Sequence, residues 1–357
     1  MPTGTQWIVF SVTAVLLQAN HVATPEAVRD PLTMGQVLVW MDGGTESLRV
    51  AQLVERQGID FVPTAKFLES LQALHAKTTL LEKLKNAKTV HAAADPAKEQ
   101  SAYADLLACL QKVDSATDAE AETECSNAEA EEPSTAQFAL GLLARRRGNA
   151  KDAVASFNAA VKAAPSIPDN HSYLGLAFAG VQDAEKAEAE YREAMRLDAD
   201  YETPVSNLAN LFLKQGDFGA ATRYARQAIA LSNEDPYAHS ILGIALCKLG
   251  ECREGLEELR TAEKLDSENS SFHRSLAAFL ESNRDYNGAL QEYRQADRLS
   301  PGDIHVHKRI LIVLLGLGRK EEAAQECEKV RIWTHEKSCR DVLQQLLAEG
   351  GEKVGVR

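Results

Sequence analysis

A pattern of 34 residues recurs six times in fixed phase over residues 134–337, and it constrains the fold more than any other feature. The units begin at Ser134, Pro168, Glu202, Pro236, Ser270 and Ile304. Their seventh residue is always Leu or Ile, and their twentieth is always Ala or Gly. The twenty-seventh residue is Ala in every unit except the last, where it is Val330. One register that holds through six units predicts a repeat protein.

This pattern resembles the tetratricopeptide repeat in its period and in its key residues. The resemblance implies an all-α fold, in which stacked helix pairs form a right-handed superhelical solenoid with a concave and a convex side. The residues themselves agree with this expectation. Each unit has two amphipathic stretches of about 13 residues, separated by a break such as Gly216-Asp217, which is typical of a helix-turn-helix. Small residues at the eighth and twentieth places let the two helices approach closely, and stacking buries the apolar face that one pair alone would expose.

Residues 1–23 are predicted to be a signal peptide. The run from Trp7 to Leu17 is apolar, has the length of a signal-peptide core and is too short for an ordinary membrane span. The segment from Met1 to Gln6 contains no Lys or Arg, which is unusual for a signal peptide. An uncleaved membrane anchor and a buried segment of a cytoplasmic protein therefore stay open as alternatives. No other segment is apolar enough to cross a membrane.

Residues 31–89 are predicted to form a small helical module that precedes the repeats. Its expected helices are a first one over Thr33–Met41, a second capped by Thr45 and ending at Gln57, a third capped by Thr64 and reaching about Leu74, and a fourth capped by Thr78 and reaching about Lys88. Phe61 is expected in the core of this module. The stretch Leu53–Thr64 resembles a small helical module that precedes tetratricopeptide arrays in some exported proteins of soil bacteria. That resemblance implies no chemistry, and the module is either an accessory domain or a docking domain.

Three further segments complete the domain organisation. Residues 90–100 are small, polar and interrupted by Pro96, which indicates a linker. Residues 101–133 resemble a degenerate repeat and are predicted to be an N-terminal capping helix pair. Residues 338–357 are predicted to be a C-terminal capping helix and a tail.

Charge and motifs exclude several classes of function. The formal net charge of −13 disfavours non-specific binding to nucleic acid, which requires a basic face. The sequence has no nucleotide-binding loop, zinc-protease helix or nucleophile elbow, so we predict no enzyme, no cofactor and no metal. His305 and His307 point in different directions on a helix and make a poor metal pair. His273 and His307 share the fourth place of their units, where we expect a packing role, and the remaining histidines are interpreted as scattered.

The six cysteines form three pairs that are close in sequence and, on a solenoid, close in space. The expected disulfides are Cys109–Cys125, Cys247–Cys252 and Cys327–Cys339. The alternative is that these residues are small apolar packing residues, because a disulfide requires a short distance between Cα atoms.

The resemblance implies that a partner binds in the concave groove, which is lined by the second, fifth, ninth, twelfth and thirteenth residues of each unit. These places supply the predicted groove residues Phe138, Leu142, Arg145, Arg146, Leu176, Asn210, Leu213, Lys214, Tyr237, Lys248, Arg274, His305, Lys308 and Ile312. These groove residues are more basic and apolar than the chain as a whole, which is acidic. The expected ligand is therefore an extended or helical peptide with acidic and apolar side chains. The carboxylate clamp of tetratricopeptide co-chaperones is absent, because Ser206 and Ile241 replace its Lys and Asn.

We therefore expect a protein-protein interaction scaffold that is exported to the periplasm or secreted, with no membrane span after signal cleavage. The alternative is a structural component of a cell-envelope complex that acts through self-association by Leu343, Leu346 and Leu347 of the capping helix.

Overall fold

The computed structural model describes residues 31–43, 47–89, 106, 108, 123, 125, 133–336 and 338–350. The chain divides into two compact units, residues 1–103 and residues 104–357. The predicted signal peptide, the linker over residues 90–100 and nearly all of the capping pair over residues 101–133 lie outside the described residues. None of the helices in the described part of the chain is both long enough and apolar enough to span a membrane.

The first unit contains four short helices, α1 (Met34–Asp42), α2 (Ser47–Gln57), α3 (Ala65–Ala73) and α4 (Thr78–Lys85). Thr33 precedes α1 and forms a capping box with Gln36, and the Thr64 hydroxyl accepts a hydrogen bond from the Phe67 amide at the start of α3. The predicted cap of the second helix, Thr45, lies outside the described residues.

The prediction for the fourth helix was wrong at both ends. Thr78 is the first helical residue of α4, and Lys77 occupies the N-cap without a side-chain hydrogen bond. The helix stops at Lys85 because the following segment pairs elsewhere: the Lys88 carbonyl accepts from the Ile59 amide, at 3.2 Å. Ile59 forms isolated parallel bridges with both Leu32 and Thr89, so three extended segments meet between the helices.

Phe61 is buried in the core of this unit, as expected, with only 1% of its surface exposed. Its ring lies edge-on against Phe67, with 5.2 Å between the ring centroids. The apolar segment around Ile59 therefore places Phe61 beneath α3.

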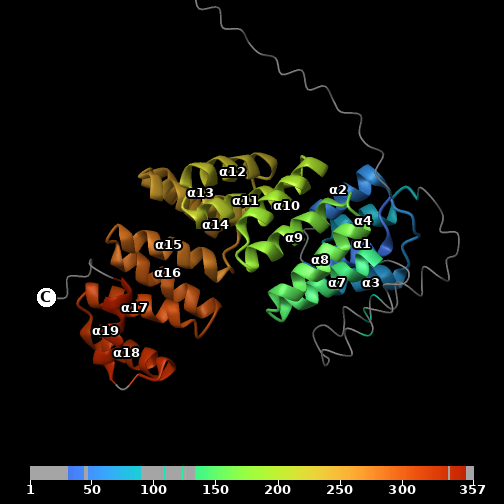
Figure 1. Ribbon diagram of the computed structural model, residues 1–357. Helices are drawn as coiled ribbons and strands as arrows, with labels where there is room; N and C mark the ends of the chain where they lie inside the picture. The colour runs from blue at the N-terminus through green and yellow to red at the C-terminus, as the bar shows by residue number, and fades with distance from the viewer. Residues whose placement is uncertain are drawn as a thin grey trace, which may run out of the picture. The chain divides into compact units, whose positions relative to one another are not determined.

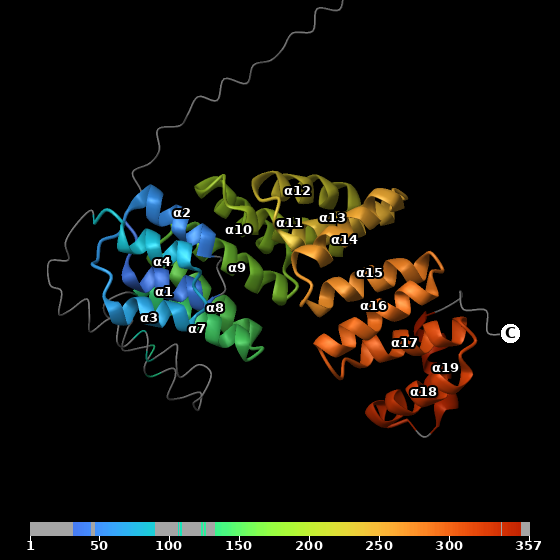
Figure 2. The ribbon, with the colours of Figure 1, turned by 180° about the vertical axis from the view of Figure 1, so that it is seen from behind.

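The second unit is a series of helix pairs followed by one further helix (Figures 1 and 2). The pairs are α7 (Pro133–Arg146) with α8 (Ala150–Ala163), α9 (Pro168–Gly180) with α10 (Ala184–Leu197), α11 (Glu202–Gln215) with α12 (Phe218–Leu231), α13 (Pro236–Leu249) with α14 (Cys252–Leu265), α15 (Ser270–Ser282) with α16 (Tyr286–Leu299), and α17 (Ile304–Gly316) with α18 (Lys320–Thr334). Each helix packs against the helices that precede and follow it in the chain. This consecutive packing of helix pairs is the all-α solenoid that the 34-residue period predicts.

The turn inside each pair depends on one left-handed residue at the fifteenth place. Four units use Gly there, with φ between 70° and 93°, and no side chain opposes that conformation. Gln182 and Arg284 adopt the same conformation with φ of 62° and 64°. The next residue then caps the second helix, and Asp217, for example, accepts from the Ala220 amide at 2.9 Å.

Small residues at the eighth place are required because a large side chain from the second helix covers them. A Cβ atom added to Gly141 would lie 2.6 Å from the ring of Phe157, and one added to Gly243 would lie 2.7 Å from Leu259. Phe157 and Leu259 are both buried. The close approach of the paired helices therefore depends on this glycine, as the sequence indicates.

The last helix, α19 (Cys339–Gly350), covers the end of the array. Val342 and Leu346 lie in the same core cluster as Val330 of α18, and Leu343 packs against it. Leu346 is therefore not available for the self-association that we considered from sequence, and the side chain of Leu347 lies outside the described residues.

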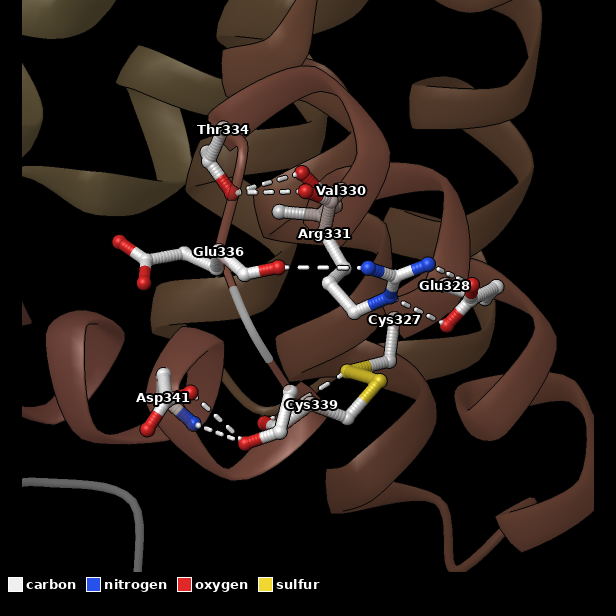
Figure 3. The surroundings of a disulfide bond; sticks show 9 residues. Cys327, Glu328, Val330, Arg331, Thr334, Glu336, Cys339 and Asp341 are labelled. Atoms are coloured by element: carbon white, nitrogen blue, oxygen red, sulfur yellow. Dashed lines mark hydrogen bonds and ion pairs between the residues drawn. A yellow bond between two sulfur atoms is a disulfide. The ribbon is translucent and has the colours of Figure 1, made fainter.

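A disulfide joins this helix to α18. Cys327 and Cys339 are bonded, with 5.8 Å between their Cα atoms (Figure 3). In the connecting segment, the Arg331 guanidinium donates to the Glu336 carbonyl at 3.3 Å and pairs with Glu328 (Figure 3). The covalent bond and these contacts hold the capping helix against the last repeat.

Candidate functional site

The predicted groove residues all lie on the first helix of their pairs, but the structure does not expose all of them. Phe138 and Leu142 were wrongly predicted as surface residues, since each is only 1% exposed. The Phe138 ring packs edge-on against Phe157 at 5.3 Å and against Tyr173 at 4.8 Å. This aromatic cluster between the first two repeats draws the side chain inward. A fifth-place residue in this repeat therefore belongs to the core.

A second group of predicted groove residues is partly exposed: Leu176, Asn210, Leu213, Lys308 and Ile312. Leu213 and Ile312 rest against the apolar core clusters of their repeats. These side chains offer a limited apolar surface beside the core.

The exposed members form what we call the first-helix surface: Arg145, Arg146, Lys214, Tyr237, Lys248, Arg274 and His305. Tyr237 is 57% exposed, and its ring contacts Phe272 at 5.1 Å while its hydroxyl accepts from the Asn269 amide at 3.3 Å. These contacts fix the orientation of an aromatic side chain that still faces solvent. Such a side chain loses little conformational entropy when it binds a partner.

Three cations of the first-helix surface have no acidic partner. Among the described residues, Arg145, Lys214 and Lys248 form no ion pair, and Arg145 instead lies 5.7 Å from the centroid of the Tyr173 ring. Arg274 differs, because it pairs at 3.0 Å with Asp303, the residue that caps α17. The first-helix surface therefore presents uncompensated positive charge on a protein whose formal net charge is −13.

Glu281 occupies the twelfth place of its unit, which is a groove place in the repeat pattern, but its carboxylate is buried and hydrogen-bonded. It accepts from the Tyr293 hydroxyl and from the Arg309 guanidinium, each at 2.9 Å. Tyr293 lies on α16 and Arg309 on α17, so the carboxylate joins two neighbouring repeats.

The expected Cys247–Cys252 disulfide is absent, and both residues are free thiols. Cys247 lies in the last turn of α13, and its sulfur fills the space that a Cβ at Gly255 would occupy. The Cys252 thiol donates to the Cys247 carbonyl at 3.4 Å. Cys125 is buried, and its expected partner Cys109 lies outside the described residues.

Buried histidines form a repeated feature that the sequence analysis missed. His171 and His239 were interpreted as scattered, yet they occupy the same fourth place as His273 and His307. In each of the four repeats, Nδ1 of the histidine contacts a glutamate carboxylate 19 residues later. The pairs are His171–Glu190, His239–Glu258, His273–Glu292 and His307–Glu326. The spacing of 19 residues between His and Glu was visible in the sequence and would have revealed them.

His305, by contrast, is exposed, so it is not part of this set. Its backbone amide donates to the Asp303 carboxylate at 2.9 Å, which caps α17. In the described part of the chain, no three side chains of His, Cys, Asp or Glu gather as metal ligands.

The stacked helix pairs and the first-helix surface define an all-α repeat protein that presents side chains along successive first helices. The tetratricopeptide repeat family model matches residues 126–202, 206–251 and 242–304. The chain is therefore a tetratricopeptide repeat protein.

Solved structures agree with this assignment. The Pseudomonas aeruginosa PilF structure has a TM-score of 0.51 and 21% identity, and the match covers 61% of this chain and 98% of that chain. A tetratricopeptide repeat protein from Parabacteroides merdae has a TM-score of 0.54 and 15% identity, and the match covers 70% of this chain and 98% of that chain. The structure of the Cut9–Hcn1 hetero-tetramer of the APC/C has a TM-score of 0.57 and 17% identity, and the match covers 79% of this chain and 58% of that chain. At such identities the likeness shows the fold alone. No curated protein sequence matches the chain.

Proposed function

We propose that this protein is a binding scaffold whose first-helix surface takes a peptide segment of a partner protein with acidic and apolar side chains. The fold supports a role in protein-protein interaction in general. The observation that carries the finer proposal is the uncompensated charge of Arg145, Lys214 and Lys248 on first helices that also expose the ring of Tyr237.

The expected mechanism is passive. Helices hold the binding side chains in place before the partner arrives, so the scaffold loses little entropy and several weak contacts act together. Carboxylates of the peptide meet the cations, and this electrostatic attraction mainly raises the association rate and the specificity. The apolar side chains of the peptide contact Tyr237 and the partly exposed Leu213 and Ile312.

The test is a screen of fluorescent peptides that alternate Asp or Glu with Leu or Phe, measured by anisotropy against the full chain. We expect saturable binding that weakens as salt is added, because salt screens exposed charges. Lys214→Glu and Lys248→Glu should weaken binding and reduce its salt dependence. Tyr237→Ala should cost about 1 kcal/mol or more of binding free energy if the ring is a contact residue.

Lys264→Glu is the matched control, because it makes the same charge change at an exposed site on α14, a second helix. If Lys264→Glu weakens binding as much as Lys248→Glu does, the effect is one of net charge, and the first-helix surface is not the site.

We further propose that the protein is exported to an oxidising compartment. The apolar run from Trp7 to Leu17 and the Cys327–Cys339 disulfide support this, since disulfides persist outside the reducing cytosol. Intact mass spectrometry of the protein from cell fractions, with and without reductant, tests the proposal. A full-length chain with reduced cysteines in the cytosol would contradict it.

A further inference from the structure

The inference concerns the four buried histidines, and it does not depend on the proposed function. In three repeats the histidine ring is bonded at both nitrogens in the same way. Nδ1 contacts a glutamate carboxylate, and Nε2 contacts a backbone carbonyl six residues earlier in the chain. The carbonyls belong to Pro165, Asn233 and Ser267, at 2.9, 3.2 and 3.0 Å from the respective rings.

Both partners of each ring are hydrogen-bond acceptors. A neutral imidazole carries one N–H group, so it can satisfy only one acceptor, whereas the doubly protonated ring satisfies both. The glutamates keep 25%, 23% and 20% of their side chains exposed, so water stabilises their ionised form. The hydrogen-bond geometry therefore favours an imidazolium ion paired with a carboxylate.

Each ring joins three parts of the solenoid. The histidine lies at the fourth place of a first helix, its glutamate at the twenty-third place of the second helix, and the carbonyl in the turn that ends the preceding repeat. One protonated ring thus holds the two helices of its own pair and also the preceding repeat. We call each such arrangement a histidine clamp. Clamps of this form join repeats one and two, three and four, and four and five.

The last joint uses a variant of the same clamp. His307 contacts Glu326 through Nδ1 and Asp297 of the preceding repeat through Nε2, the latter at 3.0 Å. Glu326 also accepts from Lys329, and the Trp333 ring lies 4.5 Å from the histidine ring. Asp297 and Glu326 line a cavity of about 170 Å³, which gives solvent a route to this ion pair.

The joint between repeats two and three lacks a clamp. Val205 occupies its fourth place and Tyr224 its twenty-third, and both side chains are buried. Neither residue is a histidine or a glutamate, so no histidine clamp forms at this joint.

We propose that the array is a proton-dependent stack, in which protonated histidine clamps lock four of its joints and loss of their protons loosens those joints. When a ring loses one proton, one of its two acceptors loses its donor, and that hydrogen bond between helices or repeats is lost. The carboxylate also loses the adjacent positive charge. The array is therefore most tightly coupled below neutral pH and loosens as the pH rises.

Carboxylates face each ring, and near His307 the cations Lys329 and Arg294 line the same cavity as Glu326 and Asp297. His171 faces Glu190 and Glu193, His239 faces Glu258, His273 faces Glu292, and His307 faces Glu326 and Asp297. Burial by itself lowers the pKa of His171, but the hydrogen bonds to Glu190 and to the Pro165 carbonyl, with the charges of Glu190 and Glu193, raise the pKa above its ordinary value.

Linkage fixes the sign of the effect. A group whose pKa is raised by folding stabilises the folded state fully at pH values below its unfolded pKa, and this contribution is lost as the pH rises through the folded pKa. For each extra proton that the folded state holds, the unfolding constant rises about tenfold per pH unit.

The experiment is urea unfolding of the full chain, followed by circular dichroism, from about pH 5.5 to 9, bracketing the ordinary histidine pKa. We expect the midpoint to fall as the pH rises through neutrality. The decisive variant is Glu190→Gln with Glu258→Gln and Glu292→Gln. A glutamine amide can donate to an unprotonated Nδ1, so the neutral ring keeps both hydrogen bonds. This triple variant should lose most of the pH slope while it still folds at high pH.

His305→Gln is the matched control, because His305 is exposed on the same helix as His307. This variant should keep the native pH slope. An unchanged slope in the triple variant would overturn the proposal.

A second measurement covers the case in which the triple variant does not fold. Imidazole ¹⁵N NMR of the native protein distinguishes a doubly protonated ring from either neutral tautomer. We expect the His171 ring to keep a proton on both nitrogens above pH 6.5, because its pKa is raised above that ordinary value. A His171 ring that is already neutral at pH 6.5 would refute the clamp.

Discussion

A Cβ atom at Gly175 would lie 2.8 Å from the ring of Tyr191, a distance too short for any side chain larger than hydrogen. Tyr191 is 1% exposed and fills the space between α9 and α10. The tyrosine at the twenty-fourth place and the glycine at the eighth therefore form one packing unit within the second repeat.

Gly175→Val should reduce the free energy of unfolding by about 1–3 kcal/mol, because overpacking forces the tyrosine ring or the helices to move. Gly219→Ala in the first turn of α12 is the control. Its added Cβ would meet Asp217 at an ordinary 3.6 Å, and alanine is the better helix former. Chemical denaturation compares the two variants. If the Gly175→Val protein is as stable as the native protein, helices α9 and α10 can move apart with little loss of unfolding free energy, which would contradict the prediction.

Loss of the Cys327–Cys339 bond should free the capping helix. The cysteines are 12 residues apart, and in the chain-entropy model a loop of similar length contributes about 3 kcal/mol. The double variant Cys327→Ser, Cys339→Ser should therefore unfold at lower denaturant and be cleaved sooner by protease near Glu336. Reductant should destabilise the native protein and leave the cap of the double variant unaffected. Equal protease sensitivity of both proteins would mean that packing of Val342 and Leu346 alone retains the helix.

The Cys247 thiol should react slowly with iodoacetamide in the folded protein. Burial, with the neighbouring Cys252, raises the pKa of Cys247 to about 12, and only the thiolate is the nucleophile. We expect peptide mapping by mass spectrometry to show little alkylation of Cys247 at pH 7.5, with faster labelling as the pH rises or after denaturation. Rapid labelling of the native protein at pH 7.5 would contradict this assignment.

His171 should titrate with a pKa above 6.5, the ordinary value for histidine. Its stabilising contribution should be fully present below pH 6.5 and should decline as the pH rises through the raised pKa. An NMR titration of the ring measures this directly. Glu190→Gln should lower the pKa, because it removes the charge that favours the imidazolium while burial still opposes it. A pKa of His171 that does not respond to Glu190→Gln would assign the shift to another group.

Local features of the repeats could be predicted from the sequence because they depend on neighbouring residues. The 34-residue period, the small residue at the eighth place and the break at the fifteenth each follow from the geometry of one helix pair. Thr33 and Thr64 cap their helices as expected, since a cap depends on residues three positions apart. The predicted extension of the fourth helix to Lys88 was wrong because Lys88 and Thr89 pair with Ile59, a contact between segments distant in the sequence.

The surface was less predictable than the fold. Phe138 and Leu142 were assigned to the groove by their place in the repeat, and the structure buries both of them among core side chains. A repeat position defines a direction from the helix, but whether a side chain is exposed depends on the sizes of its neighbours. Phe138 is buried because the large ring of Tyr173 packs against it.

The sequence by itself therefore determined the class of fold, the number of clear repeats and the residues at which each helix pair turns. These features rest on periodic burial of apolar side chains and on backbone preferences, which act over a few residues. Only the tertiary structure decided that Cys247 and Cys252 stay reduced, that Glu281 is buried, and that four histidines meet glutamates 19 residues away. Those outcomes depend on distances and directions between atoms of different helices, which packing of the whole array sets.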